Sequence, residues 1–178
     1  MPEIHRIGVI SDTHLPARGV RIPDAALRHF EDVELIIHAG DHSTRAALDQ
    51  LSAYAPVEAV QGNIDDAEIM ALLPIKRELV IGGCAIGVVH ILGERAHYAR
   101  NARREFADAR VVIFGHSHIP YLEDDGGLLL LNPGSATDRR RQPQCSIARL
   151  TIEDGAPRAE IIALPSDGQP SGPVSFSL

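Results

Sequence analysis

Several residues of the kinds that bind metal ions stand directly after short apolar runs of the sequence. Seven of them carry an imidazole, a carboxylate or an amide oxygen: Asp12, His14, Asp41, Asn63, His90, His116 and His118. Four imidazoles, two carboxylates and one amide suit borderline transition metals such as Mn, Fe, Co, Ni and Zn. Seven donors are too many for one tetrahedral ion, and the lack of thiolates among them argues against a structural zinc site. The set therefore predicts two ions that share one carboxylate, an arrangement that activates water for attack on a phosphoryl group.

The apolar runs that precede these residues have the length of β-strands. They cover 7–10, 35–37, 57–60, 85–89 and 111–114, and a further run covers 79–81. Helical periodicity lies between them at 23–30, 44–54 and 96–106, with Pro23 as a first helical residue and Ser43 as an N-cap. Strands that alternate with helices predict parallel pairing, and ligands bind at the carboxyl ends of such strands. We therefore expect the seven residues to converge at one edge.

The second half of the chain favours antiparallel strands. Gly82-Gly83 separates two strand-like runs, and Asp124-Asp125-Gly126-Gly127 and Asp154-Gly155 mark two further turns. The expected fold is a mixed α/β (α+β) domain over residues 1–164, with two packed mixed β-sheets flanked by helices. Residues 165–178 contain Pro, Gly and Ser in the pattern of a linker and are expected to form a loose C-terminal tail.

Composition limits the partners of this domain. Lys and Arg number 17 against 24 Asp and Glu, and the resulting net charge of −7 argues against a long nucleic-acid track. Cys84 and Cys145 are too few for a disulfide framework and are expected to be inert thiols. The apolar stretches fall far short of the roughly 20 residues of a membrane span, and no secretory signal is visible. These features predict a cytoplasmic protein without a membrane partner, and they leave open whether copies of the chain associate.

The order of the polar motifs resembles that of a known family. Asp12-x-His14, Gly40-Asp41, Gly62-Asn63, His90 and Gly115-His116-Ser117-His118 resemble the motifs of the calcineurin-like metallophosphoesterase superfamily. Within it, Ser11-Asp12-Thr13-His14, Gly62-Asn63-Ile64-Asp65 and Asn132-Pro133-Gly134-Ser135 are similar to the small prokaryotic phosphodiesterase branch. The resemblance implies a β-sandwich flanked by helices, in agreement with the fold expected from the strand and helix patterns.

The resemblance also implies a role for each metal-binding residue. Asp12, His14 and His118 would hold a first ion, Asn63, His90 and His116 a second, and Asp41 would bridge the two. The nucleophile would be a hydroxide between the ions rather than a side chain, so Asp41, Asn63 and His90 are the expected catalytic residues. Mn is the favoured metal, with Ni, Co, Fe and Zn as alternatives.

The sequence departs from the family pattern at two positions beside these ligands. Ile64 stands where many members carry a His that protonates the leaving group or binds phosphate. Without that acid, monoesters with poor leaving groups should react slowly, which favours diesters or activated substrates. Ile91 follows His90 where the family has Gly, which puts the geometry of this loop in question.

Three functions are compatible with these residues. The leading hypothesis is a metal-dependent phosphodiesterase acting on a small phosphodiester, and the second is a nucleotide phosphomonoesterase or pyrophosphatase using the same site. The third is a non-catalytic scaffold, because a retromer subunit shares the fold that the resemblance implies. Asn63, His42 and Arg139 are the candidate substrate contacts, whereas His38 is expected to be a buried supporting residue and His5, His29 and His97 surface residues.

Overall fold

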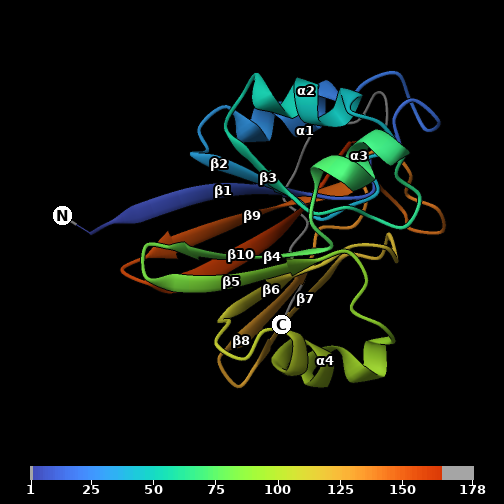
Figure 1. Ribbon diagram of the computed structural model, residues 1–178. Helices are drawn as coiled ribbons and strands as arrows, with labels where there is room; N and C mark the ends of the chain where they lie inside the picture. Colours follow the sequence, from blue (N-terminus) through green and yellow to red (C-terminus); the bar gives the residue numbers. More distant parts are fainter. Residues whose placement is uncertain (1, 166–178) are drawn as a thin grey trace.

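The computed structural model describes residues 2–165 and contains two five-stranded β-sheets that pack face to face (Figure 1). The strand order is β10-β9-β1-β2-β3 in the first sheet and β4-β5-β6-β8-β7 in the second. Both sheets are mixed: β1, β2 and β3 are parallel to one another, as are β5, β6 and β8, and the other pairs are antiparallel. The strands are β1 Ile4–Ile10, β2 Leu35–His38, β3 Val57–Ala59, β4 Lys76–Ile81, β5 Cys84–Val89, β6 Val111–Ile113, β7 Tyr121–Asp125, β8 Leu128–Asn132, β9 Ser146–Glu153 and β10 Ala156–Ala163.

The aliphatic core lies between the two sheets. Strands β1, β2, β9 and β10 of the first sheet and β5, β6 and β8 of the second supply its buried Val, Ile and Leu side chains. Helices α1 (Asp24–Leu27) and α2 (Ala46–Ser52) cover the outer face of the first sheet, and α4 (Tyr98–Glu105) covers the outer face of the second (Figure 1). The two parallel strand groups are therefore apolar on both faces, as their nearly continuous Val, Ile and Leu content predicts. The expected two-sheet fold is confirmed.

The helix starts differ from the sequence prediction in two places. Pro23 is the N-cap of α1 rather than its first residue, and its ψ of 136° is extended. Ser43 does not cap α2, because it adopts a left-handed φ of 69° and the helix begins three residues later, at Ala46. The backbone of Ser43 is held instead by a side chain of the candidate site, as described below.

Helix α3 (Ala67–Leu72) follows β3 and was not predicted from periodicity. It is six residues long, and Ile69 is its single buried residue, so it carries almost no apolar stripe. The residue before it, Asp66, caps it, because an oxygen of the Asp66 side chain accepts a hydrogen bond of 2.9 Å from the Ile69 N–H. A capping residue followed by so short a helix gives only a weak sequence pattern, and for this reason α3 was not predicted.

The three glycine turns of the second half each close an antiparallel pair. They join β4 to β5, β7 to β8 and β9 to β10.

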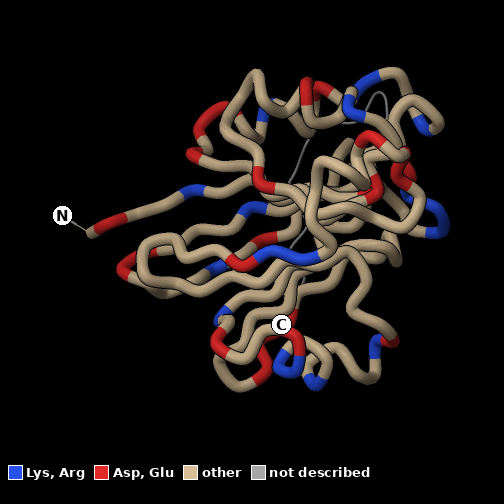
Figure 2. The backbone as a smooth tube through the Cα atoms, in the orientation of Figure 1, with Lys and Arg blue, Asp and Glu red and all other residues tan. Residues whose placement is uncertain are grey.

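Lys and Arg are interspersed with Asp and Glu along the described backbone, apart from a short basic run at 139–141 (Figure 2). Residues 2–165 include no helix that is long and apolar enough to cross a membrane. The predicted loose tail, except for Pro165, lies outside the described residues.

Candidate metal centre

The candidate site lies where strands β1, β2, β5 and β6 end, together with the loop after β3. The backbone leaves each of these strands in a tight turn, and five of the seven predicted ligands have left-handed φ angles between 48° and 69°: Asp12, His14, Asp41, His116 and His118. Non-glycine residues rarely adopt such angles, and they cluster at functional sites where the surrounding structure enforces them. The strained turns aim these side chains back across the sheet edge toward one another.

The first ligand group consists of Asp12, His14 and His118. All three are buried, and one potential ligand atom of each lies within 4.8 Å of the others. The Nε2 atoms of His14 and His118 are 3.0 Å apart, and Asp12 Oδ1 lies 3.3 Å from His118 Nε2. Three potential donors thus converge from the loops after two strands, β1 and β6, and could hold one metal ion.

The second group consists of Asp41, His90 and His116, again with ligand atoms within 4.8 Å of one another. Asp41 and His90 are buried, whereas His116 is exposed. The amide oxygen of Asn63 lies 2.9 Å from His116 Nδ1 and so belongs to the same cluster. This group faces solvent through His116 and Asn63, and this is the side from which a substrate can enter.

Asp41 faces both groups with the same oxygen atom. Its Oδ2 lies 3.3 Å from His90 Nε2 and 3.9 Å from His14 Nε2. Its other oxygen, Oδ1, accepts a hydrogen bond of 3.1 Å from the Ile64 N–H. One oxygen is thus fixed by the backbone, and the other is free between the groups, as a bridging carboxylate requires.

Hydrogen bonds behind the site orient two of the imidazoles. His90 Nδ1 donates to the Ala39 carbonyl at 2.7 Å, and His118 Nδ1 donates to the Asp138 carbonyl at 2.6 Å. A carbonyl can only accept, so Nδ1 of both rings carries the proton and Nε2 presents its lone pair to the site when the ring is neutral. Metal-ligating histidines are commonly supported in this way.

The electrostatics of the second group link its members. Burial would raise the pKa of Asp41, but the close approach and charge of His90 outweigh it, and the pKa is lowered. Burial would lower the pKa of His90, but Asp41 and Asp12 outweigh that effect and raise it. Burial together with neighbouring imidazoles lowers the pKa values of His14 and His116. Asp41 is therefore ionised, and His14 and His116 are neutral near pH 7, which are the forms that bind metals.

Two glycines allow the backbones to approach this closely. A Cβ atom on Gly62 would collide with the carboxylate and backbone of Asp41, and one on Gly115 would collide with the side chains of Ser11 and Asp12. The Gly-Asn and Gly-His pairs of the sequence are thus packing requirements of the site as well as turns.

The donor set fits divalent metal ions. Among the described residues, Asp12 Oδ1 and His90 Nε2 are buried without a hydrogen-bond partner. A buried polar atom without a partner is costly, and coordination of a cation is a common way to satisfy it. Nitrogen and oxygen donors in two groups that share one carboxylate are typical of a pair of borderline transition metals.

Two further buried histidines, His38 and His42, lie near the candidate ligands. His38 is fully buried, accepts from the Gly40 N–H at Nδ1 and therefore donates from Nε2 to Thr13 Oγ1 at 3.0 Å. His42 stacks on His38 with ring centroids 3.7 Å apart and donates from Nε2 to the Val60 carbonyl. His42 was a candidate substrate contact. It has no exposed surface in this structure.

Arg139 is the other predicted substrate contact outside the ligand groups. Arg139 is exposed, and its Nη1 donates to the Gln142 carbonyl at 2.7 Å. The charge of its neighbour Arg140 contributes to the lowered pKa of His116. Arg140 also has a left-handed φ of 46°, a conformation that sequence patterns do not predict for arginine.

Asp65 is a supporting residue that the motif analysis did not single out. It is buried, and its two oxygens accept hydrogen bonds of 2.7 Å from the Ser43 N–H and the Gly62 N–H. One carboxylate thereby ties the loop after Asp41 to the loop that carries Asn63. Its place in Gly62-Asn63-Ile64-Asp65 was visible, but the contact across 22 residues was not.

The chain is similar in sequence to known proteins. The family model described as the calcineurin-like phosphoesterase superfamily domain matches residues 6–155. A probable metallophosphoesterase of Methanocaldococcus jannaschii is 42% identical over 153 residues, which cover 83% of this chain and 76% of the relative.

Two solved structures share the fold. Vacuolar protein sorting 29 of Cryptosporidium parvum has a TM-score of 0.80 at 20% identity and covers 93% of this chain and 94% of its own. Wild-type Vps29 of Entamoeba histolytica, solved in complex with zinc, has a TM-score of 0.70 at 27% identity and covers 89% of this chain and 98% of its own.

Proposed function

Because the chain belongs to the calcineurin-like phosphoesterase superfamily, we propose that it is a metal-dependent phosphodiesterase that hydrolyses a small phosphodiester. The observation that supports this most directly is the pair of ligand groups around the free oxygen of Asp41. Two divalent ions held there would supply Lewis-acid activation of water and of the phosphoryl group. Mn is the metal we favour, with Ni, Co, Fe and Zn as alternatives for the same donors.

The candidate ligands would hold these ions in two groups. Asp12, His14 and His118 form the buried group, and Asn63, His90 and His116 form the group that faces solvent. Asp41 holds one negative charge between them. Asn63 and His116 lie at the open side, so they are the residues of this set that can also contact the phosphate of a bound substrate.

A diester is preferred over a monoester because of the side chain at position 64. Ile64 directly follows Asn63 and is 47% exposed, so an apolar group occupies the place where the resemblance implies a proton donor. A diester with a good leaving group needs no such donor, and its single negative charge needs less compensation than the two charges of a monoester.

A scaffold function is the alternative that the structural neighbours raise, since Vps29 proteins share the fold. The ordered donor geometry favours the enzyme: a scaffold gains nothing from five strained left-handed residues and two buried atoms without partners.

A substrate panel tests the proposal. Purified protein, stripped of metal and reloaded with Mn, Ni, Co, Zn or Mg, would be assayed with bis(p-nitrophenyl) phosphate and with p-nitrophenyl phosphate. We expect metal-dependent hydrolysis of both, with the larger kcat/KM for the diester. A larger kcat/KM for the monoester with every metal would overturn the diester assignment, and no hydrolysis of either would favour the scaffold.

A further inference from the structure

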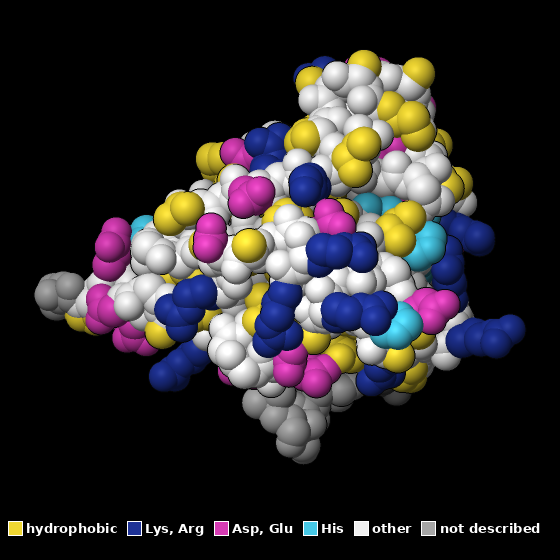
Figure 3. Space-filling view, turned by 60° about the horizontal axis from the view of Figure 1, so that its bottom comes forward, with side chains coloured by type: hydrophobic (Ala, Val, Ile, Leu, Met, Phe, Trp, Pro, Cys, Tyr) yellow, Lys and Arg dark blue, Asp and Glu magenta, His cyan; other side chains and the backbone are white. Residues whose placement is uncertain are grey.

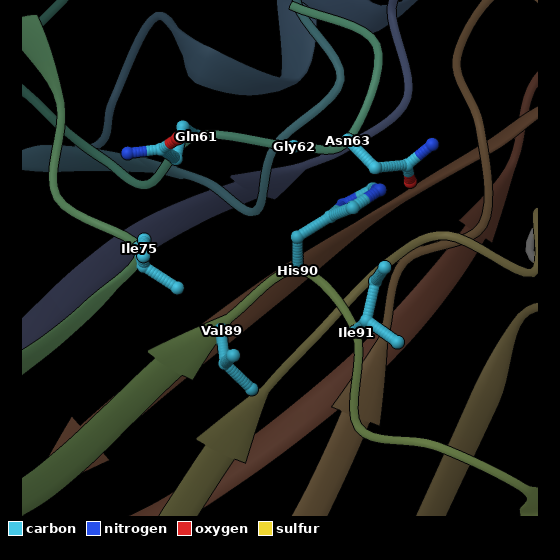
Figure 4. Close-up of a pocket in the computed structure, with 7 residues that line it drawn as sticks. All are labelled: Gln61, Gly62, Asn63, Ile75, Val89, His90 and Ile91. Atoms are coloured by element: carbon cyan, nitrogen blue, oxygen red, sulfur yellow. The ribbon is translucent and has the colours of Figure 1, made fainter. Parts of the chain in front are cut away.

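A cleft opens beside the solvent-facing ligand group and is not accounted for by metal binding. It has a volume of about 210 Å³ and is lined by Gln61, Gly62, Asn63, Ile75, Val89, His90 and Ile91 (Figure 4). His90 and Asn63 belong to both the cleft and the ligand cluster, so the cleft begins at the candidate reaction centre. In Figure 4 the His90 ring points toward the Asn63 amide, and Ile75, Val89 and Ile91 lie at separate places around His90.

Two of the three aliphatic lining residues are exposed, whereas Val89 is half-buried in β5 and packs against the core under α4. Ile75 is 70% exposed and Ile91 is 46% exposed. Ile75 lies in the bend before β4, and Ile91 begins the loop after β5, so neither is part of a strand that packs into the core. Large aliphatic side chains gathered at the mouth of a polar site are characteristic of a ligand-binding surface. On the face drawn in Figure 3, some histidine and hydrophobic side chains lie next to one another, with Lys and Arg side chains nearby.

The absence of charged side chains from the described lining of the cleft restricts the kind of ligand that it can bind. Among the described residues, no Lys, Arg, Asp or Glu side chain lines it. Its polar lining side chains are the candidate ligands Asn63 and His90 and the neutral amide of Gln61, which donates to the Leu73 carbonyl at 2.9 Å. A ligand that fits this cleft would therefore place an uncharged apolar part against the isoleucines and an anionic part at the candidate metal centre.

On this basis we propose that the cleft binds an uncharged flat ring, an aryl group or a nucleobase, carried by one ester arm of the substrate. The inference rests on the proposed function and names the class of diester. An apolar cavity of roughly 150 Å³ is large enough for benzene, so about 210 Å³ accommodates one ring system but not two. Ile75, Val89 and Ile91 are the specificity residues.

A second hollow next to this cleft does not extend the proposal. It shares the three aliphatic residues and adds Lys76 and Arg104 on its far side. Both cations are already close to one carboxylate, because Glu105 lies 3.6 Å from Lys76 Nζ and 3.3 Å from Arg104 Nη2. The ring-binding role is therefore confined to the cleft at His90 and Asn63.

Two phosphonates that differ only in the ring test the proposal without any turnover. Isothermal titration calorimetry of the metal-loaded protein would compare phenylphosphonate with methylphosphonate, whose stable C–P bonds keep both intact. We expect the phenyl compound to bind about tenfold more tightly, equivalent to about 1.4 kcal/mol. Equal affinity of the two compounds would overturn the ring site, even if the protein hydrolyses diesters.

Matched variants assign the difference to the cleft. Ile75→Ser is expected to reduce the phenyl-over-methyl ratio from about tenfold to about threefold or less, because it removes aliphatic surface from the ring contact. Val80→Ser is the control: Val80 is a comparably exposed aliphatic residue, at 74%, in β4 but outside the cleft lining. A ratio that falls equally in both variants, or in neither, would contradict the proposal.

A protein partner that covers the aliphatic lining is the competing occupant. If it were the true one, the wild-type protein would bind both phosphonates equally, and Ile75→Ser would leave that equality unchanged. Failure of the proposed hydrolysis would be seen separately, as an inactive protein that still distinguishes the two phosphonates.

Discussion

At the scale of single residues, the candidate site depends most on Asp41. Six other residues supply donors to one group each, whereas Asp41 Oδ2 lies within 3.9 Å of a histidine nitrogen from both groups. Its carboxylate also lies 3.3 Å from His90 Nε2 and helps to raise the pKa of His90. Loss of that charge removes attraction for both cations at once.

The first prediction concerns this bridging carboxylate. Asp41→Asn is expected to reduce diesterase kcat/KM by roughly 100-fold or more and to weaken both metal sites, because even supporting residues of metal sites are worth about 10–100-fold. Metal titration and steady-state kinetics on the same preparation measure the two effects. His5→Gln is the matched control: His5 pairs with Glu34 at 2.9 Å on the far part of β1. Equal losses in the two variants would refute the bridging role.

The second prediction concerns the residue after Asn63. The backbone N–H of Ile64 serves Asp41, and any residue can supply it, so Ile64→His changes only the exposed side chain. The new imidazole is expected to raise monoesterase relative to diesterase kcat/KM by about tenfold or more, since proton transfer to a leaving group contributes roughly 10²–10⁴-fold. Parallel assays of the two substrates measure this ratio. An unchanged ratio would mean that position 64 does not control the preference.

At the scale of elements, the strand ends are held together by side chains that bind no metal. Asp65 joins the loops after β2 and β3, and the His38–Thr13 hydrogen bond joins the ends of β2 and β1. These contacts keep the strained turns in place, since the turns themselves are unfavourable. Metal affinity should therefore depend on residues that never touch a metal.

The third prediction compares two neighbouring aspartates. Asp65→Asn leaves one loop N–H facing an amide N–H₂ instead of a carboxylate oxygen, and is expected to weaken metal binding about 10–100-fold. Asp66→Asn changes the cap of α3 and is expected to cost at most about 1 kcal/mol of folding stability without altering metal affinity. Calorimetric metal titration and urea unfolding separate the two outcomes. Equal metal affinities in both variants would contradict the positioning role of Asp65.

The fourth prediction concerns the buried His38. Burial and the neighbouring His42 lower its pKa well below 6.5, so the native state keeps it neutral while the unfolded state binds a proton below pH 6.5. Its contribution to stability is present above pH 6.5 and is lost as the pH falls toward the native pKa, with a slope of about 1.4 kcal/mol per pH unit. Urea unfolding of the metal-free protein between pH 5 and 7.5 measures the slope. His38→Gln is expected to flatten it by about that amount, and an unchanged slope would show that His38 is not the group responsible.

At the scale of the whole molecule, the sandwich places two sets of parallel strands so that their ends face one another. Strands β1 and β2 come from one sheet and β5 and β6 from the other, and each ligand group draws on both sheets. Asp12 and His14 follow β1, whereas His118 follows β6. Separation of the sheets would therefore dismantle both groups, and ions bound between them should stabilise the folded protein.

Part of the fold and most of the candidate ligands could be predicted from the sequence. Apolar runs that end in Asp, Asn or His predict both the parallel strands and the convergence of their side chains, because the carboxyl ends of such strands share an edge. The left-handed angles at Asp12 and His118 and the contact from Asp65 to Ser43 could not be predicted, since they depend on loops far apart in the chain. The burial of His42 depends likewise on stacking with His38, which no local pattern encodes.

The acidic balance of the chain also acquires a structural meaning. The chain has a net charge of −7, and among the described residues no Lys or Arg lines the cleft at the candidate site, although Lys76 and Arg104 line the adjoining hollow. Bound divalent ions would supply the local positive charge for a phosphate, which explains how an acidic protein can bind an anionic substrate.

The most direct test of the central claim is the metal stoichiometry of the active protein. Metal-free protein would be titrated with Mn²⁺ while bound metal and diester hydrolysis are followed together. We predict about two ions per chain, with activity that reaches its maximum only when the second is bound. Full activity in the metal-free protein, or saturation at one ion per chain, would contradict the dimetal assignment.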